Sequence, residues 1–554
     1  MSLTSAAPRR RIGLSATANG DPVPLATRRA AGSWRDLDPF WGWFGSVCVA
    51  ALALFFRLWR LGRPDAFSFD ETYYAKDAWS LLHFGYVRNY QDTANVQILR
   101  GNALDQWKDT PSIIVHPEVG KWLIALGERA FGMDPFGWRV SAAVAGSLMV
   151  LVMCRLARRL TGSTALGCIA GLLLAFDGMH LVLSRLALLD IFVALFLLIG
   201  VHCVVADREW HRRRLAQRAV IGDYPRFGAI RAVLVRPWLL VGGIAWGLAV
   251  GTKWTALIPL AAFGILVWLW SAGARRSLGV RGAWLKSAVV DGIPAFLQLV
   301  VVAFAVYVLT WTGWLVNAHE YEKHLSNTQY TQYDGGHEWP TANEPDAHGF
   351  GEVTQSLRSL AYYHQDIWTF HTHFLNDSTH TYASKPRGWL LLSRPVGIDA
   401  QLGIDPGKQG CQAAPGSDCL RQILALGNPV IWWGGALALL FAVFQWLGAR
   451  DWRFGMVVIG AAATWLPWFR YDDRPIFIFY AIAILPFTVL ALTLTIGKLL
   501  DPLPGRGRST WGVIAAGSFL VLALIAFAWF WPIWTDGLLT HQQWSERMWF
   551  RRWI

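Results

Sequence analysis

Long apolar runs separated by polar segments dominate the chain. Several of these runs reach the roughly 20 residues that a helix needs to cross a bilayer. The pattern predicts eleven membrane-spanning helices, at about 40–58, 138–154, 164–181, 187–206, 237–252, 255–271, 287–311, 430–448, 454–470, 475–496 and 510–531. Two long polar segments, 59–137 and 312–429, interrupt the series. The sequence therefore predicts an all-α integral membrane protein whose two large loops carry amphipathic helices.

Arginine-rich segments orient this predicted bundle. The basic stretches "RLARR", "DREWHRRRLAQR", "GARRSLGVRG" and "GKLLDPLPGRGR" all fall on the same side of the membrane as residues 1–38. The positive-inside rule places that side in the cytoplasm, so the N-terminus is expected inside and the C-terminus outside. We expect a disordered basic tail at 1–38, one transmembrane domain at 39–531 and an outer tail at 532–554. Both long polar segments are then outer loops.

Composition supports the membrane assignment and explains the charge. The 554 residues are 54% apolar and 16% charged, whereas soluble domains are about 25% charged. A formal net charge of +13 would favour nucleic-acid binding in a soluble protein. Here the arginine clusters of short loops account for that charge, so no nucleic-acid partner is expected.

Two of the six cysteines lie in a polar loop. Cys48, Cys154, Cys168 and Cys203 lie in apolar runs and are expected to be packing residues. Cys411 and Cys419 flank the stretch "QAAPGSD". The predicted topology places this pair in an oxidising compartment, so the pair is a candidate disulfide.

Unusual ionisable residues gather at one predicted face of the membrane. Such residues indicate a functional site when they lie at membrane depth, although any one of them alone could snorkel or cap a helix. The set near the outer face comprises Asp70, Glu71, Arg185, Asp190, Lys253, Asp472, Asp473 and Arg474.

The adjacent carboxylates of "AFSFDETYYAKDAW" have two interpretations. Alone, they favour a helix start in which Ser68 is the cap and Glu71, three residues on, completes a capping box. The other interpretation is sugar transfer from a lipid phosphate. A phosphate leaves with the help of cations alone, whereas an acceptor hydroxyl needs a carboxylate base. One base and a cationic clamp would give in-line displacement with inversion, because sequence neighbours cannot flank a sugar as a double-displacement pair.

The stretch 113–132 predicts an amphipathic helix on the membrane interface. His116 and Pro117 would begin it, and its apolar residues recur at helical spacing around Lys121 and Glu128. The chain shows no zinc-ligand spacing and no nucleotide-binding motif. No cofactor is therefore indicated, and the sequence gives a divalent metal no support.

Six motifs, in order along the chain, resemble the protein O-mannosyltransferases, which are GT-C glycosyltransferases. The motifs are "FDE", "HPEVGKW", "LSRLALLD", "GTKW", "HTYASKPRGWLLLSRPV" and "LPWFRYDDRPIFIFYAIAILP". The resemblance covers about 40–496, and the chain lacks the repeats of the eukaryotic MIR domain, so it resembles a bacterial form. Glu118 stands where the common family pattern, His-Pro-Pro-x-Gly-Lys, has its second proline.

The resemblance implies an activity and a set of site residues. The donor would be polyprenyl-phosphate mannose, and the acceptors would be Ser or Thr hydroxyls of exported proteins at the outer face of the cell membrane. Asp70 matches the proposed base and Glu71 its partner. We expect phosphate binding by Arg185, Lys253 or Arg474, and support of the site from His116, Lys121, Asp190 and His380. The secretion translocon is an expected partner, beside membrane lipid.

One further expectation concerns Arg474. It directly precedes Pro475 at the start of a predicted span, where a helix N-terminus would favour an anion. The alternative is a surface ion pair between Arg474 and Asp472 or Asp473.

Two other functions stay open. The same chemistry could glycosylate a lipid or a cell-wall glycan, and only the ordered motifs favour a protein acceptor. A transporter of the lipid-linked sugar would place its charges near the bilayer midplane and show inverted repeats. The charges here lie at one face, and no repeat is evident.

Overall fold

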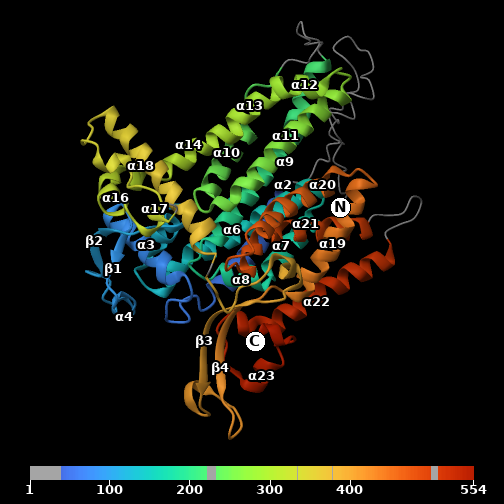
Figure 1. The fold of residues 1–554 in the computed structure, drawn as a ribbon. Coiled ribbons are helices and arrows are strands. Elements are labelled where there is room, and N and C mark those ends of the chain that lie inside the picture. The colour runs from blue at the N-terminus through green and yellow to red at the C-terminus, as the bar shows by residue number, and fades with distance from the viewer. Residues whose placement is uncertain (1–38, 221–231, 334, 377, 501–508) are drawn as a thin grey trace, which may run out of the picture. The chain divides into compact units, whose positions relative to one another are not determined.

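The computed structural model describes residues 39–220, 232–333, 335–376, 378–500 and 509–554. The predicted basic tail, 1–38, lies outside the described residues. Figure 1 shows the chain as a ribbon, and the contacts within it divide the chain into two compact units. One unit contains residues 200–244 and 263–302, and the other contains 39–199, 245–262 and 303–554, within the described ranges.

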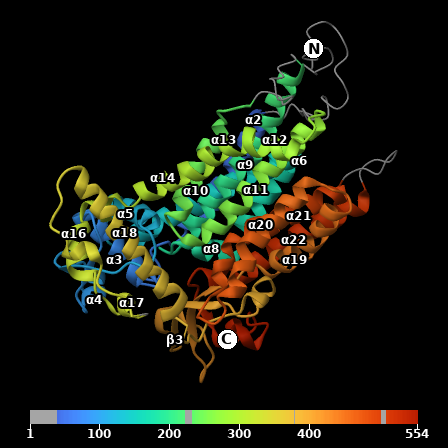
Figure 2. The same ribbon diagram turned by 45° about the horizontal axis from the view of Figure 1, so that its top comes forward.

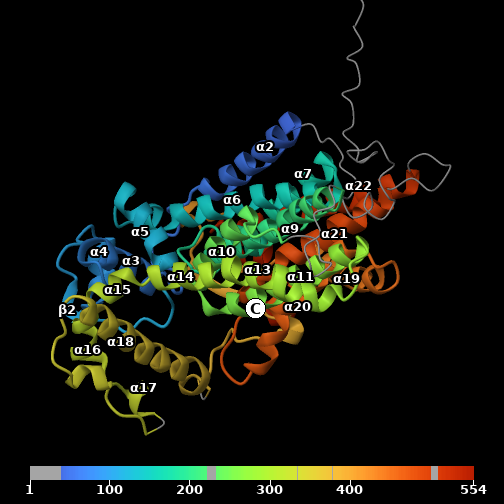
Figure 3. The same cartoon turned by 90° about the horizontal axis from the view of Figure 1, so that it is seen from above.

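Three helices near the N-terminus of the larger unit pack closely against one another. They are α2 (Pro39–Leu58), α6 (Pro135–Thr161) and α7 (Thr164–Ala175) (Figure 3). The buried face of α6 is rich in alanine, glycine and serine, and such small residues let membrane helices approach each other. Asp134 caps the start of α6 by accepting from Gly137 N at 2.7 Å, and Gly162 ends it in the left-handed conformation.

A second group of helices forms the C-terminal part of the same unit. The helices α19 (Pro429–Leu447), α20 (Trp452–Trp465), α21 (Leu485–Leu500) and α22 (Thr510–Trp534) lie side by side (Figure 2). Asn428, Asp451 and Ser509 cap α19, α20 and α22 through their side chains. These caps explain why each helix begins where it does.

The smaller unit consists of long helical segments joined by buried ion pairs. It contains parts of α9 (Asp190–Val220), α10 (Pro237–Val250) and α11 (Leu257–Ser277). It also contains most of a long interrupted helix, built from α12 (Ala283–Ser287), η2 (Ala288–Gly292), α13 (Ile293–Phe296), η3 (Leu297–Val301) and α14 (Val302–Leu309), in which η2 and η3 are π-helical. Arg236 pairs with Asp207, and Arg275 pairs with Asp291 at 2.6 Å. Both pairs are buried.

The two polar segments fold into short helices and small sheets. The first contains α3 (Glu71–Phe84), β1 (Arg88–Tyr90), α4 (Ala94–Leu99), β2 (Trp107–Pro111) and α5 (Val119–Phe131). The helical elements of the second are α15 (Thr312–Val316), α16 (Ala318–Leu325), α17 (Gln329–Gln332), η4 (Pro340–Asn343), α18 (Phe350–Thr369), η5 (Phe370–Phe374), η6 (Pro386–Leu391) and η7 (Lys408–Gly410). Its strands are β3 (Val396–Ile404) and β4 (Cys419–Ala425).

The small sheets correct the expectation of an all-α fold. Strands β1 and β2 form an antiparallel pair, and β3, β4 and β5 (Leu539–Thr540) form a second sheet. The hairpin of β3 and β4 extends from the larger unit in Figure 1, with α23 (His541–Ser545) beside it. The predicted C-terminal tail is thus packed, because β5 pairs with β4. Arg394 also donates to two carbonyl oxygens of this tail, those of Arg552, which lies within η10 (Arg551–Trp553), and Ile554.

Seven of the described helices are long and apolar enough to cross a membrane, and three further apolar helices have 10–17 residues. The structure therefore supports a multi-pass helical membrane protein and differs from the predicted spans in detail. The predicted span 164–181 breaks after Ala175, because Asp177 accepts from the amide of His180 and starts α8 (Gly178–Leu183). The predicted span 475–496 becomes α-helical only at Leu485, after the 3-10 turn η9 (Ile478–Ala483). The basic stretch after residue 206, predicted as a loop, continues α9 to Val220.

Candidate functional site

Glu71 is the first residue of α3, and its carboxylate is fully occupied by the protein. Arg139 Nε donates to Oε1 at 2.8 Å and Arg139 Nη2 donates to Oε2 at 2.7 Å. The amides of Ser68 and Ala187 donate to the same carboxylate, each at 2.9 Å. Neither Glu71 nor Arg139 has exposed side-chain surface. Glu71 therefore joins α3, α6 and the segment before α9, and its carboxylate is not presented to a substrate.

The capping box predicted at Ser68 is present only in part. Glu71 does reach back to the Ser68 amide, as a capping box requires. The N-cap position, however, belongs to Asp70, whose side chain makes no capping hydrogen bond. The Ser68 hydroxyl instead faces Arg139 Nη2 at 3.5 Å.

Asp70 is the neighbouring carboxylate, and its environment is different. Among the described residues, no donor forms a hydrogen bond with its side-chain oxygens. Burial raises the pKa of Asp70 to about 6, while the charge of Lys253 lowers the pKa and that of Asp190 raises it further. The carboxylate is thus poised to exchange a proton near neutral pH.

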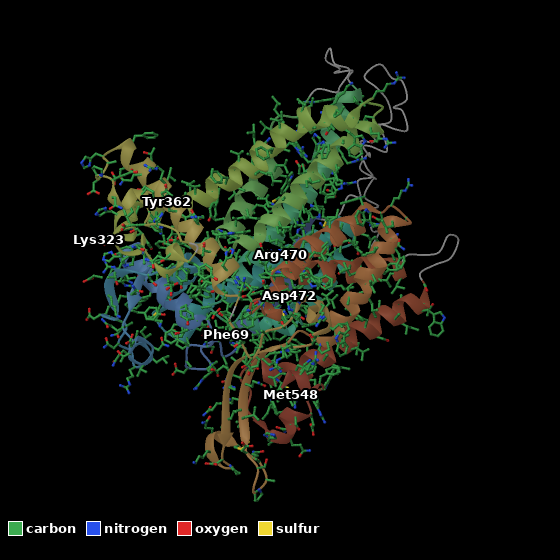
Figure 4. All side chains as sticks on the ribbon, viewed as in Figure 1. Phe69, Lys323, Tyr362, Arg470, Asp472 and Met548 are labelled. Carbon is green, nitrogen blue, oxygen red and sulfur yellow. A yellow bond between two sulfur atoms is a disulfide. The ribbon has the colours of Figure 1, made fainter. Side chains whose placement is uncertain are left out.

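The backbone before Asp70 is held in an uncommon conformation. Phe69 has a φ of 54°, in the left-handed region that bulky side chains rarely adopt. Its ring packs edge-on against Phe477 and Phe479, with ring centroids 5.7 and 5.8 Å away. Figure 4 labels Phe69 and Asp472. Aromatic packing from the segment after Asp472 thus stabilises the strained residue beside the carboxylate.

Lys253 and Asp190 form a buried ion pair beside Asp70. Lys253 Nζ donates to both carboxylate oxygens of Asp190, at 2.9 and 2.8 Å. The same ammonium lies 5.1 Å from the ring centroid of Tyr480. Asp190 opens α9, and Lys253 lies in the turn after α10. Because an ammonium has three donors, Lys253 can bind an anion without leaving Asp190.

Arg474 lies near Lys253 and His116, but it does not stand at the start of a helix. The expectation that Pro475 begins a helix is wrong: residues 475–477 are extended before η9. Arg474 Nη1 donates to the backbone oxygen of His371 at 2.6 Å, while its buried Nε has no hydrogen-bond partner among the residues that the structure describes. No ion pair joins Arg474 to Asp472 or Asp473 in the described part of the chain; Asp472 lies 3.6 Å from Lys385 instead.

His371, which the sequence prediction missed, connects several of these segments. Its Nε2 donates to the Val115 carbonyl at 2.7 Å, so its Nδ1 is left to accept from Arg474 Nη1 at 3.3 Å. Its ring stacks on His116, with centroids 5.1 Å apart. Burial lowers the pKa of His371 to about 4. The imidazole therefore stays neutral and holds the guanidinium and the predicted site residue His116 in place.

A hydrogen-bonded chain fixes the turn that carries Lys253. Trp254 Nε1 donates to the Tyr307 hydroxyl at 2.9 Å, and Tyr307 donates to His364 Nε2 at 2.5 Å. His364 Nδ1 donates to the Leu360 carbonyl at 2.6 Å, which sets this tautomer. His364 and His371 lie seven residues apart along α18 and η5. Their helical spacing, two turns on one face, was a signal that could have identified both.

Arg185 has a different role from the predicted phosphate contact. Its Nη1 donates to the backbone oxygens of Phe56, Arg57 and Trp59, at 3.2, 2.9 and 2.6 Å. These carbonyls belong to the C-terminal end of α2, where helices leave acceptors unsatisfied. Arg185 is buried and stabilises a helix end.

Lys121 and Glu118 lie on the inward face of α5, beside the main cluster. Lys121 pairs with Asp77 at 2.9 Å, and both side chains are nearly inaccessible. Glu118 is fully buried at the N-cap of α5, with Trp122 beside its carboxylate. Burial raises the pKa of Glu118 to about 7, although the positive charge of Lys121 lowers it in part. The outward face is apolar, with Leu126 and Phe131 exposed, which fits an interfacial helix.

Three further predictions concern the second polar segment and metal binding. His380 is exposed, and its ring lies edge-on to Phe69, 6.1 Å away. Cys411 and Cys419 form a disulfide with a Cα separation of 5.8 Å, near the tip of the β3–β4 hairpin. Among the described residues, no group of three or more His, Cys, Asp or Glu side chains could hold a metal ion.

The cluster combines one base with two cations. Asp70 can take a proton from a hydroxyl, because no donor in the ranges that the structure describes occupies its oxygens. Lys253 and Arg474 keep N–H groups that can stabilise a departing anion. Of the predicted residues, the structure brings Asp70, His116, Asp190, Lys253 and Arg474 together, while Glu71, Arg185 and Lys121 support the surrounding fold.

Two family models match the chain. The first, described as dolichyl-phosphate-mannose-protein mannosyltransferase, matches residues 47–221. The second, described as the C-terminal four TMM region of protein-O-mannosyltransferase, matches residues 356–553. Asp70, Glu71, Arg139, Arg185 and Asp190 fall within the first, and Arg474 falls within the second.

Curated relatives and a solved structure agree with these models. The chain is 33% identical to a polyprenol-phosphate-mannose–protein mannosyltransferase of Mycolicibacterium smegmatis, over 93% of this chain and 94% of the relative. It is 32% identical to the protein of that name from Mycobacterium tuberculosis, over 96% and 95%. The structure of the S. cerevisiae protein O-mannosyltransferase Pmt1–Pmt2 complex bound to the sugar donor is similar over 92% of both chains, with a TM-score of 0.63 at 14% identity, which shows a shared fold. The chain thus belongs to the polyprenol-phosphate-mannose–protein mannosyltransferases, as its ordered motifs predicted.

Proposed function

We propose that this chain transfers mannose from polyprenol-phosphate mannose to Ser or Thr hydroxyls of exported proteins, with inversion at the anomeric carbon. The observation that carries the proposal is the contrast between two adjacent carboxylates. Glu71 is saturated by four protein donors, whereas the described part of the chain offers Asp70 none, and Asp70 lies close to the charges of Lys253 and Asp190. One free carboxylate is what a single displacement needs.

The bonds change in one step. The acceptor oxygen attacks the anomeric carbon of mannose while its proton passes to an Asp70 oxygen. The bond between the anomeric carbon and the phosphate oxygen breaks, and the electron pair leaves with the lipid phosphate. Lys253 and Arg474 stabilise the anionic leaving group, so no general acid is required. Proton removal by Asp70 contributes roughly 10²–10⁴-fold to the rate.

The finer topology is part of the proposal. We infer eleven spans, the N-terminus in the cytoplasm, the C-terminus outside, and an active site at the extracytoplasmic face of the cell membrane. Residues 39–531 would form one catalytic transmembrane domain. The arginine-rich segments support this orientation, and the Cys411–Cys419 disulfide fits an oxidising compartment. Exported acceptors would then reach the site from the secretion translocon.

The test is a transfer assay with the full-length chain in membranes. Polyprenyl-phosphate mannose labelled in the sugar is mixed with a Ser/Thr-rich peptide, and the label in the peptide is measured. The wild-type chain is expected to label the peptide, and Asp70→Asn to lose that activity. Asp92→Asn is the matched control, because Asp92 is an exposed residue of the same polar segment. Label that enters only lipid or glycan, or an Asp70→Asn variant with normal transfer, would refute the proposal.

A further inference from the structure

The helix α18 exposes a stripe of apolar side chains along most of its length. Phe350, Leu357 and Trp368 expose 83%, 39% and 51% of their surface. Because successive residues of a helix are turned by about 100°, these three side chains point within about 20° of one another. Val353 and Ala361, which are also exposed, flank them on the two sides. These five residues form an apolar stripe that the described part of the chain leaves largely uncovered.

The apolar stripe lies between a buried sector and a polar sector of the helix surface. On one side of it, Tyr363 and Ile367 are buried in a core of aromatic side chains. On the other side, Arg358 and Gln365 are exposed, and Arg358 donates to the Glu344 carboxylate at 2.8 and 2.7 Å. A helix that faces protein, then an apolar medium and then water has the surface that a lipid–water boundary requires.

Contacts of His364 place α18 at the ends of two helices that are long and apolar enough to cross a membrane. Tyr307 lies in the last turn of the candidate span Ala283–Leu309 and donates to His364 Nε2 at 2.5 Å. Trp254 is the first residue of the candidate span Trp254–Ser277, and its ring stacks on His364 with centroids 5.4 Å apart. His364 projects from the same side of α18 as the apolar stripe. The stripe therefore faces the level at which these spans end.

We propose that α18 lies on the outer leaflet and that lipid covers its apolar stripe, at the boundary between acyl chains and headgroups. The depth set by His364 selects lipid as the occupant, and aromatic side chains such as Trp368 are enriched at this boundary. Uncovered apolar surface also continues from the end of the span, because Leu309 and, in α15, Val316 are exposed, and α15 contacts α18 (Figure 3). The proposal rests on the proposed function for the outer orientation and for the effect on transfer.

The lipid contact acts on both cations of the candidate site. α18 continues into η5, where His371 accepts from Arg474 through its ring and its backbone oxygen. His364 fixes the turn that carries Lys253, through the chain of hydrogen bonds described above. The positions of both proposed phosphate contacts thus depend on the position of α18. The bilayer that supplies the lipid donor thereby also positions the groups that bind its phosphate.

A fluorophore at position 357 measures the depth of the apolar stripe without any transfer reaction. Leu357→Cys is made in a chain whose four cysteines outside the disulfide are replaced by alanine. The labelled chain is placed in nanodiscs that hold one copy each, and quenching by a nitroxide on the lipid chain near the headgroup is compared with quenching by aqueous iodide. Gln365→Cys, on the polar sector of the same helix, is the matched control.

We expect the lipid nitroxide to quench the label at position 357 more than the label at 365, and iodide to do the reverse. Quenching at 357 by iodide alone would show that water covers the stripe and overturns the proposal. Quenching by neither agent would show that another part of the chain covers it, with the same consequence. A label that the lipid nitroxide reaches less when two chains share a nanodisc identifies a second copy as the occupant and also overturns the proposal.

A charge placed in the stripe tests the link to transfer. Leu357→Glu should draw α18 out of the lipid, because a carboxylate is costly there, and should lower kcat/KM for the donor. A misplacement of about 1 Å at the reacting groups can cost up to about 10²-fold, so we expect a loss of roughly tenfold. Gln365→Glu adds the same charge to the polar sector and should keep wild-type kinetics. Leu357→Gln is the milder variant if Leu357→Glu does not fold, and should show a smaller loss.

The two measurements keep the proposals apart. Normal donor kinetics in both Leu357 variants, or equal losses in Leu357→Glu and Gln365→Glu, would show that the stripe does not position the cations. Absence of transfer by the wild-type chain refutes the proposed function, whereas the quenching of the label at position 357 decides the lipid contact by itself.

Discussion

Arg139 donates two parallel hydrogen bonds to the Glu71 carboxylate, at 2.8 and 2.7 Å, and neither side chain has exposed surface. The same guanidinium also donates to the backbone oxygens of Pro64 and Ala66, at 2.9 and 2.8 Å. It thereby holds the segment that leads to Asp70 against α6. The carboxylate next to the proposed base thus positions that base and is itself shielded from substrate.

Removing one partner of this pair should destabilise the protein. Glu71→Ala leaves Arg139 as an uncompensated buried charge, which costs roughly 3–5 kcal/mol. Glu71→Ala should therefore lower the thermal unfolding temperature of the detergent-purified chain and reduce the amount of folded protein. Glu71→Leu combined with Arg139→Met should recover much of that stability, because it removes both charges. An unchanged unfolding temperature in Glu71→Ala would contradict the structural role.

Asp70→Asn should behave in the opposite way. Folding raises the pKa of this carboxyl from 3.8 to about 6, so ionisation destabilises the folded state as pH rises through this range. Asn removes the charge and should leave the chain at least as stable as the wild type at pH 7. Transfer should fall roughly 10²–10⁴-fold, because the acceptor hydroxyl loses its base. Thermal unfolding and transfer rate, measured on the same preparation, check both parts, and retention of more than about a tenth of the rate would refute the role as base.

The ionisation of Asp70 also predicts the acid side of the pH profile. The base must be ionised to accept a proton, and the pKa of Asp70 is raised to about 6 by burial. The transfer kcat/KM should therefore rise with pH through about 6 and level off above it, a profile that reports the free enzyme. Initial rates from pH 5 to 8, at low peptide concentration, provide the measurement. A profile flat down to pH 5 would exclude Asp70 as the group that titrates.

The position of the candidate site could be predicted from the sequence better than the roles of its residues. Hydropathy found the long helices, because a membrane span leaves a continuous apolar run. It could not find the break at Asp177, which depends on its hydrogen bonds to His180 and to Asn428 in a distant segment. It also extended α21 through residues 475–484, since short 3-10 and extended stretches of apolar residues have no distinct signature.

Ionisable residues could be assigned to one region but not to their partners. Glu71 and Arg185 match the family motifs as well as Asp70 does, yet one is saturated by Arg139 and the other caps α2. These roles depend on backbone carbonyls and amides brought close by folding, which residue type alone does not indicate. His371 was missed for the same reason, since no motif quoted from the sequence contains it.

Arg185 and Arg474 should therefore differ when each is replaced. Arg185→Met removes four hydrogen bonds at and just after the end of α2 and should lower the unfolding temperature, with little effect on donor KM of the folded fraction. Arg474→Ala should raise donor KM or lower kcat, depending on whether the guanidinium binds phosphate in the ground state or only as it departs. Its peptide KM should change little. Donor titrations and thermal unfolding separate the two variants, and normal donor kinetics in Arg474→Ala would remove it from the phosphate contact.

His371 should matter through Arg474 and His116 and not through its own charge. Its pKa is lowered to about 4 by burial, so it is neutral over the range in which the transferase is assayed. His371→Ala removes the ring nitrogen that accepts from Arg474 Nη1 at 3.3 Å and the ring on which His116 stacks, and keeps only the backbone acceptor of residue 371. Donor kinetics should then shift in the same direction as in Arg474→Ala, and the double variant should be no worse than Arg474→Ala alone, because the two residues act as a unit. His373→Ala is the matched control, because His373 lies two residues along η5 and is exposed, and among the described residues its side chain hydrogen-bonds only to Thr372. Two outcomes would show that His371 does not position Arg474. One is additive losses in the double variant, and the other is a displaced acid limb of the pH profile in His371→Ala with unchanged donor KM and kcat.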